Sequence, residues 1–220
     1  GKPLDKEVNI RRIAERTPGF SGAELMNLVN EAAILAARRN HKTIAMDELR
    51  SAALKVMLGP ERKSYLLNER ERKITAYHEA GHALVAHYLE HADPIHKVSI
   101  VSRGMAAGYT LKLPVEDVRM YSRAKFRDDL AVMLGGYVAE LETFSDITTG
   151  ASSDLKQATD LARRMVMDFG MSETLGARTF GSREEHASSR FTIRDTSDIS
   201  PKVAEEIDHE VTEVVNTAQK

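Results

Sequence analysis

The sequence predicts a mainly α protein that contains one small β-hairpin or sheet. Apolar residues recur at helical spacing through most of the 220 residues, and glycine- and proline-containing breakers separate the helical segments. Alternation in twos appears only over a short stretch near residues 98–113. A chain of this length can bury a substantial core in one or two domains.

The first sixty residues are expected to form a small helical subdomain. Ser21 and Glu24 have the spacing of a capping box, in which each residue satisfies a backbone amide of the other at the start of a helix. An apolar stripe follows them, and a further helix ends at Gly59-Pro60. We therefore expect a domain over residues 1–60 and a polar linker over residues 61–68.

Residues 69–220 are expected to form the second, larger domain. The charged segment 69–73 opens a helix, and alternating apolar residues then predict two short strands around Val98–Ile100 and Tyr109–Leu113. The segment 181–189 is polar and is expected to be loose. Three more helices are expected, one from about Ser122, one from near Ser152 and a last one that starts at Ser200-Pro201.

Composition excludes several classes of protein. Lys+Arg (31) and Asp+Glu (33) nearly balance, which argues against a nucleic-acid-binding surface. The absence of cysteine excludes disulfides and leaves nitrogen and oxygen as metal ligands. No apolar run reaches 18 residues, so the chain as given is expected to be soluble. It begins at Gly1 without a methionine, and we expect it to be part of a longer protein.

The stretch His78-Glu79-Ala80-Gly81-His82 is a H-E-x-x-H sequence inside a predicted helix. Four residues span just over one helical turn, so both imidazoles project from the same face and can share one metal ion. Glu79 lies between them, close enough to take a proton from a water on that ion. Gly81 has no side chain beside the pair, which allows another backbone to approach. This arrangement predicts a zinc hydrolase.

A catalytic zinc ion needs a third protein ligand, and no third histidine follows at the spacing that would supply it. The ligand must then come from an acidic residue elsewhere in the chain. Spacing alone does not choose among four candidates: Glu140, Asp146, Asp154 and Asp160. Asp154 stands in the first turn of a predicted helix, a position that the helix dipole favours for an acid even without a metal.

Six segments in order resemble the FtsH family, the membrane-anchored AAA+ zinc proteases. Residues 17–33, with T-P-G-F-S-G-A-E-L, resemble the helical lid of that family's ATPase domain. Residues 59–64 resemble its interdomain junction, and residues 77–84 resemble its zinc helix. Residues 108–117 resemble the strand and loop beside its active site. Residues 149–154 resemble its ligand loop, and residues 170–176 resemble the G-M-S-E-T-L-G motif that follows.

The resemblance implies a specific active site. It makes Asp154 the third zinc ligand beside His78 and His82, with Glu79 as the general base. It implies that Gly22 and Ala23 approach nucleotide in the ATPase ring. The hairpin residues around the active site, which could bind substrate as an added strand, are Gly108, Tyr109, Thr110 and Leu111.

The resemblance also implies the setting of the parent protein. The parent is expected to be a homo-hexamer that uses ATP and Mg²⁺ to feed unfolded or membrane proteins to the zinc site. It is expected to be anchored in a membrane through segments outside this chain, with the protease facing the bacterial cytoplasm or an organelle matrix or stroma. This chain contains no phosphate-binding loop, so we expect it not to hydrolyse ATP by itself.

Two other readings remain at this point. The chain could be a non-catalytic helical binding or adaptor fragment whose metal motif is accidental, in which case it would contain no zinc. It could also be an ATPase fragment in which the lid is the functional part, in which case it would bind ATP tightly.

Overall fold

The computed structural model describes residues 2–62, 67–104, 107–113, 120–184, 193–195 and 199–220. Two compact units divide the chain, one with residues 1–79 and 93–118 and the other with residues 80–92 and 119–220. The boundary falls inside one continuous helix, α4 (Glu69–Tyr88). The prediction of a mainly helical fold with a small antiparallel sheet is confirmed.

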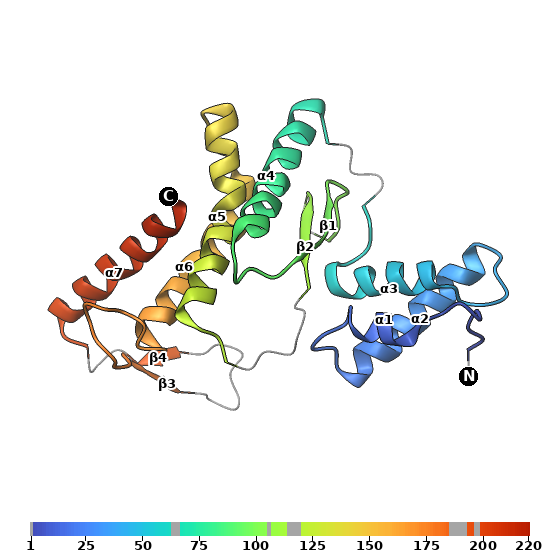
Figure 1. Ribbon diagram of the computed structural model, residues 1–220, viewed down its shortest axis with the longest axis horizontal. Helices are drawn as coiled ribbons and strands as arrows, with labels where there is room; N and C mark the ends of the chain where they lie inside the picture. Colours follow the sequence, from blue (N-terminus) through green and yellow to red (C-terminus); the bar gives the residue numbers. More distant parts are fainter. Residues whose placement is uncertain (1, 63–66, 105–106, 114–119, 185–192, 196–198) are drawn as a thin grey trace. The chain divides into compact units, whose positions relative to one another are not determined.

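The first unit opens with three helices, α1 (Ile10–Ala14), α2 (Gly22–Arg38) and α3 (Met46–Leu58). Helices α2 and α3 lie side by side (Figure 1). Their facing surfaces bury small and branched apolar side chains: Leu28, Ala32 and Ala36 against Leu49, Ala52 and Ala53. Small residues at these positions allow the two backbones to approach closely.

Local signals set the ends of α2 and α3 as the sequence predicts. The Glu24 amide donates to Ser21 Oγ at 3.3 Å and the Ser21 amide donates to Glu24 Oε2 at 2.7 Å, so the capping box is confirmed. Helix α3 is capped by Gly59, whose φ of 85° lies in the region that favours glycine. Residues 63–66 of the predicted linker lie outside the described residues.

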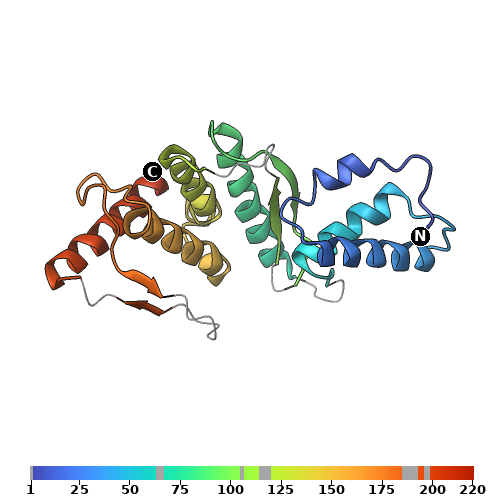
Figure 2. The same cartoon turned by 90° about the horizontal axis from the view of Figure 1, so that it is seen from below.

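The sheet next to α4 contains the two strands β1 (Ile95–Ser99) and β2 (Tyr109–Lys112) (Figure 2). The strands pair antiparallel, with Val98 opposite Thr110. Strand β1 starts earlier than predicted and ends before Ile100. Three successive side chains of β1 are exposed, so this strand does not follow the alternation of buried and exposed positions from which a half-buried strand is predicted. Most of the predicted loop after Leu113, residues 114–117, lies outside the described residues.

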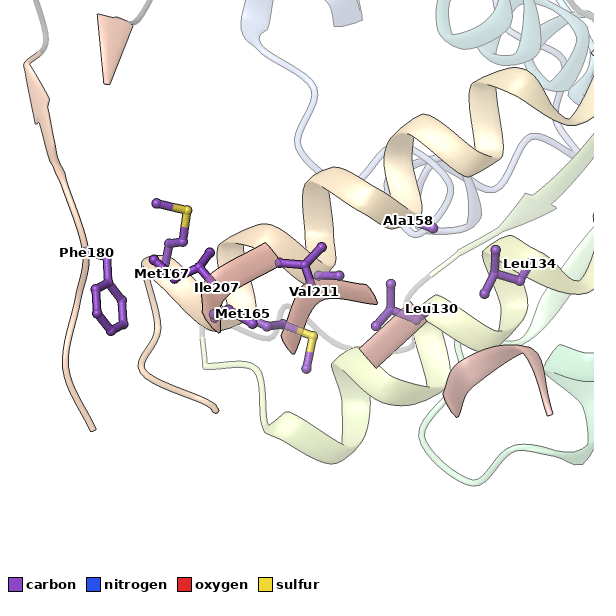
Figure 3. Packing of buried hydrophobic residues seen from close by; sticks show 10 residues of the cluster. Leu130, Leu134, Ala158, Met165, Met167, Phe180, Ile207 and Val211 are labelled. Carbon is purple, nitrogen blue, oxygen red and sulfur yellow. The ribbon is translucent and has the colours of Figure 1, made fainter. Parts of the chain in front are cut away.

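The second unit is built on α5 (Arg123–Phe144), α6 (Ser152–Met167) and α7 (Pro201–Gln219), which pack against one another. Figure 3 shows their shared core, to which each helix contributes side chains and to which Phe180 is added from the segment after α6. Its buried side chains include Leu130 and Leu134 of α5, Ala158, Met165 and Val166 of α6, and Ile207 and Val211 of α7.

The expectation that residues 181–189 are loose is wrong at its start. Strand β3 (Ser182–Glu184) pairs antiparallel with β4 (Ile193–Asp195). The three residues of β3 are all polar, so they lack the apolar alternation from which a strand is predicted. Residues 185–189 lie outside the described residues. Within the described ranges, no helix is long and apolar enough to cross a membrane.

Candidate metal centre

Helix α4 has a well-defined start that fixes the register of its metal motif. The Glu71 amide donates to Asn68 Oδ1 at 2.8 Å, and the Asn68 amide donates to Glu71 Oε2 at 3.1 Å, which forms a reciprocal cap. Two turns later the helix buries the three polar residues of the motif, with exposed fractions of 8% for His78, 7% for Glu79 and 9% for His82. Buried polar groups require partners, so their surroundings decide their role.

Gly81 allows helix α5 to lie directly against the motif, as the sequence predicts. A Cβ on Gly81 would lie 2.3 Å from the carbonyl oxygen of Gly135 and 2.6 Å from Cβ of Ala139. The approach is tight from the other side as well, because a Cβ on Gly135 would lie 2.9 Å from the carbonyl oxygen of Gly81 and 3.2 Å from Cα of His82. The two glycines therefore set the separation between α4 and α5 beside the histidine pair.

The same helix orients the second imidazole. Nδ1 of His82 lies 2.6 Å from the carbonyl oxygen of Val132, which can only accept a hydrogen bond. The proton of neutral His82 is therefore on Nδ1, and Nε2 presents a lone pair. A backbone carbonyl bound to one imidazole nitrogen is the usual support for a histidine that ligates a metal through the other.

Asp154 reaches this lone pair from the first turn of α6. Its Oδ2 lies 3.6 Å from Nε2 of His82. One nitrogen or oxygen atom from each of His78, His82 and Asp154 lies within 4.8 Å of the others. Ligand atoms about 2.0–2.1 Å from a tetrahedral zinc ion lie about 3.3 Å apart, so the His82–Asp154 pair is within a few tenths of an ångström of coordinating geometry. The three residues could hold a zinc ion.

The four acids that spacing leaves open lie in different surroundings. Glu140 is buried, but its Oε2 accepts a hydrogen bond from the Thr148 amide at 2.8 Å. Asp146 is exposed and its Oδ1 accepts from the next amide in the chain at 2.9 Å. Asp160 is exposed on α6. Of the four, Asp154 is the acid that is grouped with the two histidines.

Glu140 acts instead on the turn that delivers Asp154. Thr148 begins a short 3₁₀ turn, Thr149–Ala151, that runs directly into α6 at Ser152. The Thr148 side chain accepts from the Gly150 amide at 3.1 Å, and the Glu140 carboxylate holds the Thr148 amide. Helix α5 thus supports both Asp154 and His82, the latter through Val132.

Glu79 lies against the strand β2. The Thr110 hydroxyl lies 2.7 Å from Glu79 Oε2, and a Cβ on Gly108 would lie 2.8 Å from Oε1. The carboxylate that the motif places beside the metal ligands therefore faces two residues of the predicted substrate strand.

Comparison with known sequences identifies the family. The model of peptidase family M41 matches residues 65–220, and the model of the AAA+ lid domain matches residues 7–51. The chain belongs to peptidase family M41. The resemblance to the FtsH family is confirmed, since relatives that carry that name match nearly all of the chain.

Three relatives illustrate the similarity. The ATP-dependent zinc metalloprotease FtsH 1 of Sphaerobacter thermophilus is 56% identical over 220 residues, which are 100% of this chain and 34% of the relative. FtsH 1 of Thermomicrobium roseum is 55% identical over 218 residues, 99% of this chain and 33% of the relative. FtsH of Slackia heliotrinireducens is 51% identical over 217 residues, 99% of this chain and 28% of the relative. The chain spans about a third of the length of these M41 relatives.

The other residues of this M41 chain that are predicted to contact substrate or nucleotide differ in their burial. Tyr109 is buried, with Lys97 and Arg103 each 5.9 Å from its ring centre, and Leu111 is half-buried on β2. Gly22 and Ala23 are exposed in the first turn of α2. Their contacts with substrate or nucleotide stay predictions.

Sequence reasoning missed three supports of the site. The carbonyl of Val132 acts through its backbone, so no residue type could reveal it. The sequence predicts that Thr110 contacts substrate, and it does not reveal the contact of its hydroxyl with Glu79. The sequence offers Glu140 as a possible metal ligand, but an acid shortly before a turn can also accept from an amide of that turn, as Glu140 does from Thr148.

Proposed function

We propose that this chain is the catalytic part of a zinc-dependent endopeptidase that cuts unfolded, damaged or membrane proteins. The observation that carries the proposal is the approach of Asp154 Oδ2 to His82 Nε2, together with His78 in one group of possible ligand atoms. Two imidazoles and one carboxylate leave a fourth tetrahedral position open, as in catalytic zinc sites.

The residues of the chain divide the work of peptide hydrolysis. A zinc ion held by His78, His82 and Asp154 would act as a Lewis acid and lower the pKa of a coordinated water to about 7. Glu79 accepts a proton from the attacking water and later delivers one to the leaving amine nitrogen, so it is base first and acid second. Its burial excludes bulk water that would compete for these transfers.

Strand β2 is the proposed guide for the substrate. It pairs with β1 along one edge, and among the described strands none pairs with its other edge. An extended peptide can add to such an edge through main-chain hydrogen bonds, which depend little on side-chain identity. Binding of this kind at Gly108–Leu111 suits an enzyme that cuts many unfolded sequences.

The setting of the complete protein is part of the proposal. The relatives are named ATP-dependent, and the match to an AAA+ lid supports an ATPase ring upstream of the peptidase. We infer a homo-hexamer that consumes ATP with Mg²⁺, is anchored in a membrane and delivers unfolded chains to the zinc site. Gly22 and Ala23 would approach nucleotide there. The domain limits 1–60, 61–68 and 69–220 stay part of this proposal.

The test compares Glu79→Gln with Glu90→Gln in zinc-loaded protein. Glu90 is exposed just beyond α4, so its variant controls for the loss of one carboxylate. Glu79→Gln should keep its zinc and lose at least about 100-fold in the cleavage rate of unfolded casein, since general acid–base catalysis contributes about 10²–10⁴-fold. Undiminished cleavage by Glu79→Gln would remove this residue from the mechanism, and wild-type protein that binds no zinc would favour the adaptor reading.

A further inference from the structure

Thr110 is placed to hold the carboxylate of Glu79. Its hydroxyl carries one proton and lies 2.7 Å from Glu79 Oε2 and 3.1 Å from the carbonyl oxygen of the same residue. The carboxylate is nearer and negatively charged, and hydrogen bonds to charged acceptors are shorter and stronger than those to neutral ones. The hydroxyl proton therefore points to Oε2.

Gly108 faces the other oxygen of the same carboxylate. A Cβ on Gly108 would lie 2.7 Å from Cγ2 of Thr75, 2.8 Å from Oε1 of Glu79 and 2.9 Å from Cγ of Glu79. Residues two apart in an extended segment face the same side, so Gly108 and Thr110 both face α4. The strand thus bounds the Glu79 carboxylate on one side. Thr110 supplies a hydrogen-bond donor, and Gly108, which has no side chain, leaves the space that the carboxylate occupies.

We infer that Thr110 and Gly108 are positioning residues for the general base, an inference that rests on the proposed function. A glutamate side chain has three rotatable bonds, and a misplacement of about 1 Å at a reacting group can lower a rate by about 100-fold. The hydrogen bond from Thr110 and the close wall at Gly108 remove most of that freedom. Glu79 is then set before the substrate arrives.

This role also determines which groups of Gly108 and Thr110 are available to contact a substrate. Because the side chain of Thr110 and the open face of Gly108 serve Glu79, these two residues offer a peptide only their main chain. Tyr109 points to the opposite side and is buried beside Arg103. Recognition along β2 therefore rests on backbone groups, while the side chains of its helix-facing residues are committed to the base.

A purely structural role for Thr110 makes a different prediction. If its hydroxyl served only to fasten β2 to α4, its loss would lower the free energy of unfolding or weaken substrate binding. Loss of base positioning instead lowers kcat and leaves KM and zinc content unchanged, because the interaction matters in the transition state rather than in ground-state binding.

The experiment uses the complete zinc-loaded protein and a fluorogenic peptide. Thr110→Val keeps the shape and removes the hydroxyl, Thr110→Ser restores it, and Thr212→Val changes an exposed threonine on α7 as a control. Thr110→Val should lower kcat by about 10- to 100-fold, the size expected for a hydrogen bond to a charged group, with KM within about twofold of wild type. Thr110→Ser should return kcat to within about threefold.

Gly108→Ala supplies an independent arm if Thr110→Val does not fold. It should lower kcat with its zinc content retained, because the added methyl group displaces the Glu79 carboxylate. Unchanged kcat in Thr110→Val, equal impairment of Thr110→Ser, or a loss confined to KM or zinc content would overturn the inference. Glu79→Gln separates this failure from that of the proposed function: an active Glu79→Gln refutes the base itself, whereas an inactive one beside a normal Thr110→Val refutes only the positioning role.

Discussion

Gly81→Ala should destabilise the contact between α4 and α5 that supports the metal ligands. The new Cβ would lie 2.3 Å from the Gly135 carbonyl oxygen, so the two helices must separate by about 1 Å to reach ordinary contact. The obstacle is backbone rather than a flexible side chain, which places the overpacking cost near the upper end of about 1–3 kcal/mol. Alanine regains up to about 1 kcal/mol of helix propensity. We therefore expect a net loss of about 2 kcal/mol.

The same displacement should reach the metal through His82. Its Nδ1 donates to the Val132 carbonyl on α5, so separation of the helices stretches the 2.6 Å bond that orients the ring. Loss of such a support lowers metal affinity by about 10- to 100-fold.

Urea unfolding and chelator competition for zinc measure the two effects separately. Gly22→Ala is the matched control, because a Cβ there would have no atom within 4 Å. A Gly81→Ala protein with wild-type stability and zinc affinity would refute the account of how α5 supports the site.

Two further perturbations test other contacts. Glu140→Gln should weaken zinc binding by about tenfold, because the charge-assisted hydrogen bond to the Thr148 amide is lost. The control variant Glu142→Gln, at an exposed position, should bind zinc as wild type does. Equal zinc affinities of the two variants in a chelator titration would contradict this role of Glu140. Hydrogen bonds from Thr174 and Ser172 lower the pKa of Glu210, so the charged form stabilises the fold above the ordinary glutamate pKa and this contribution disappears as the pH falls through the lowered value. Urea midpoints should therefore show Glu210→Gln less stable than wild type at neutral pH, with a difference that shrinks below about pH 4; a constant difference would contradict the assignment.

Local sequence signals are sufficient where neighbours in the chain determine the structure. The cap of α2 depends on residues three apart, and the shared face of His78 and His82 follows from helix geometry alone. The opening that Gly81 leaves was predictable as well, although the partner that fills it, Gly135, was not.

Contacts that join distant segments were beyond the sequence without the family resemblance. Asp154 is 72 residues from His82, and spacing alone does not distinguish it from three other acids. The contact between Thr110 and Glu79 depends on which face of β2 meets α4, which a one-residue change in register would reverse. Strand β3 escaped prediction because pairing rather than apolar patterning defines it.

The most direct test of the metal centre is the zinc content of purified wild-type protein and of Asp154→Asn after dialysis against a weak chelator. Two imidazoles and a carboxylate should retain one zinc ion per chain, and the variant, which keeps the shape of the side chain but loses its charge, should release it. Full zinc occupancy in Asp154→Asn under the same conditions would show that another residue completes the site.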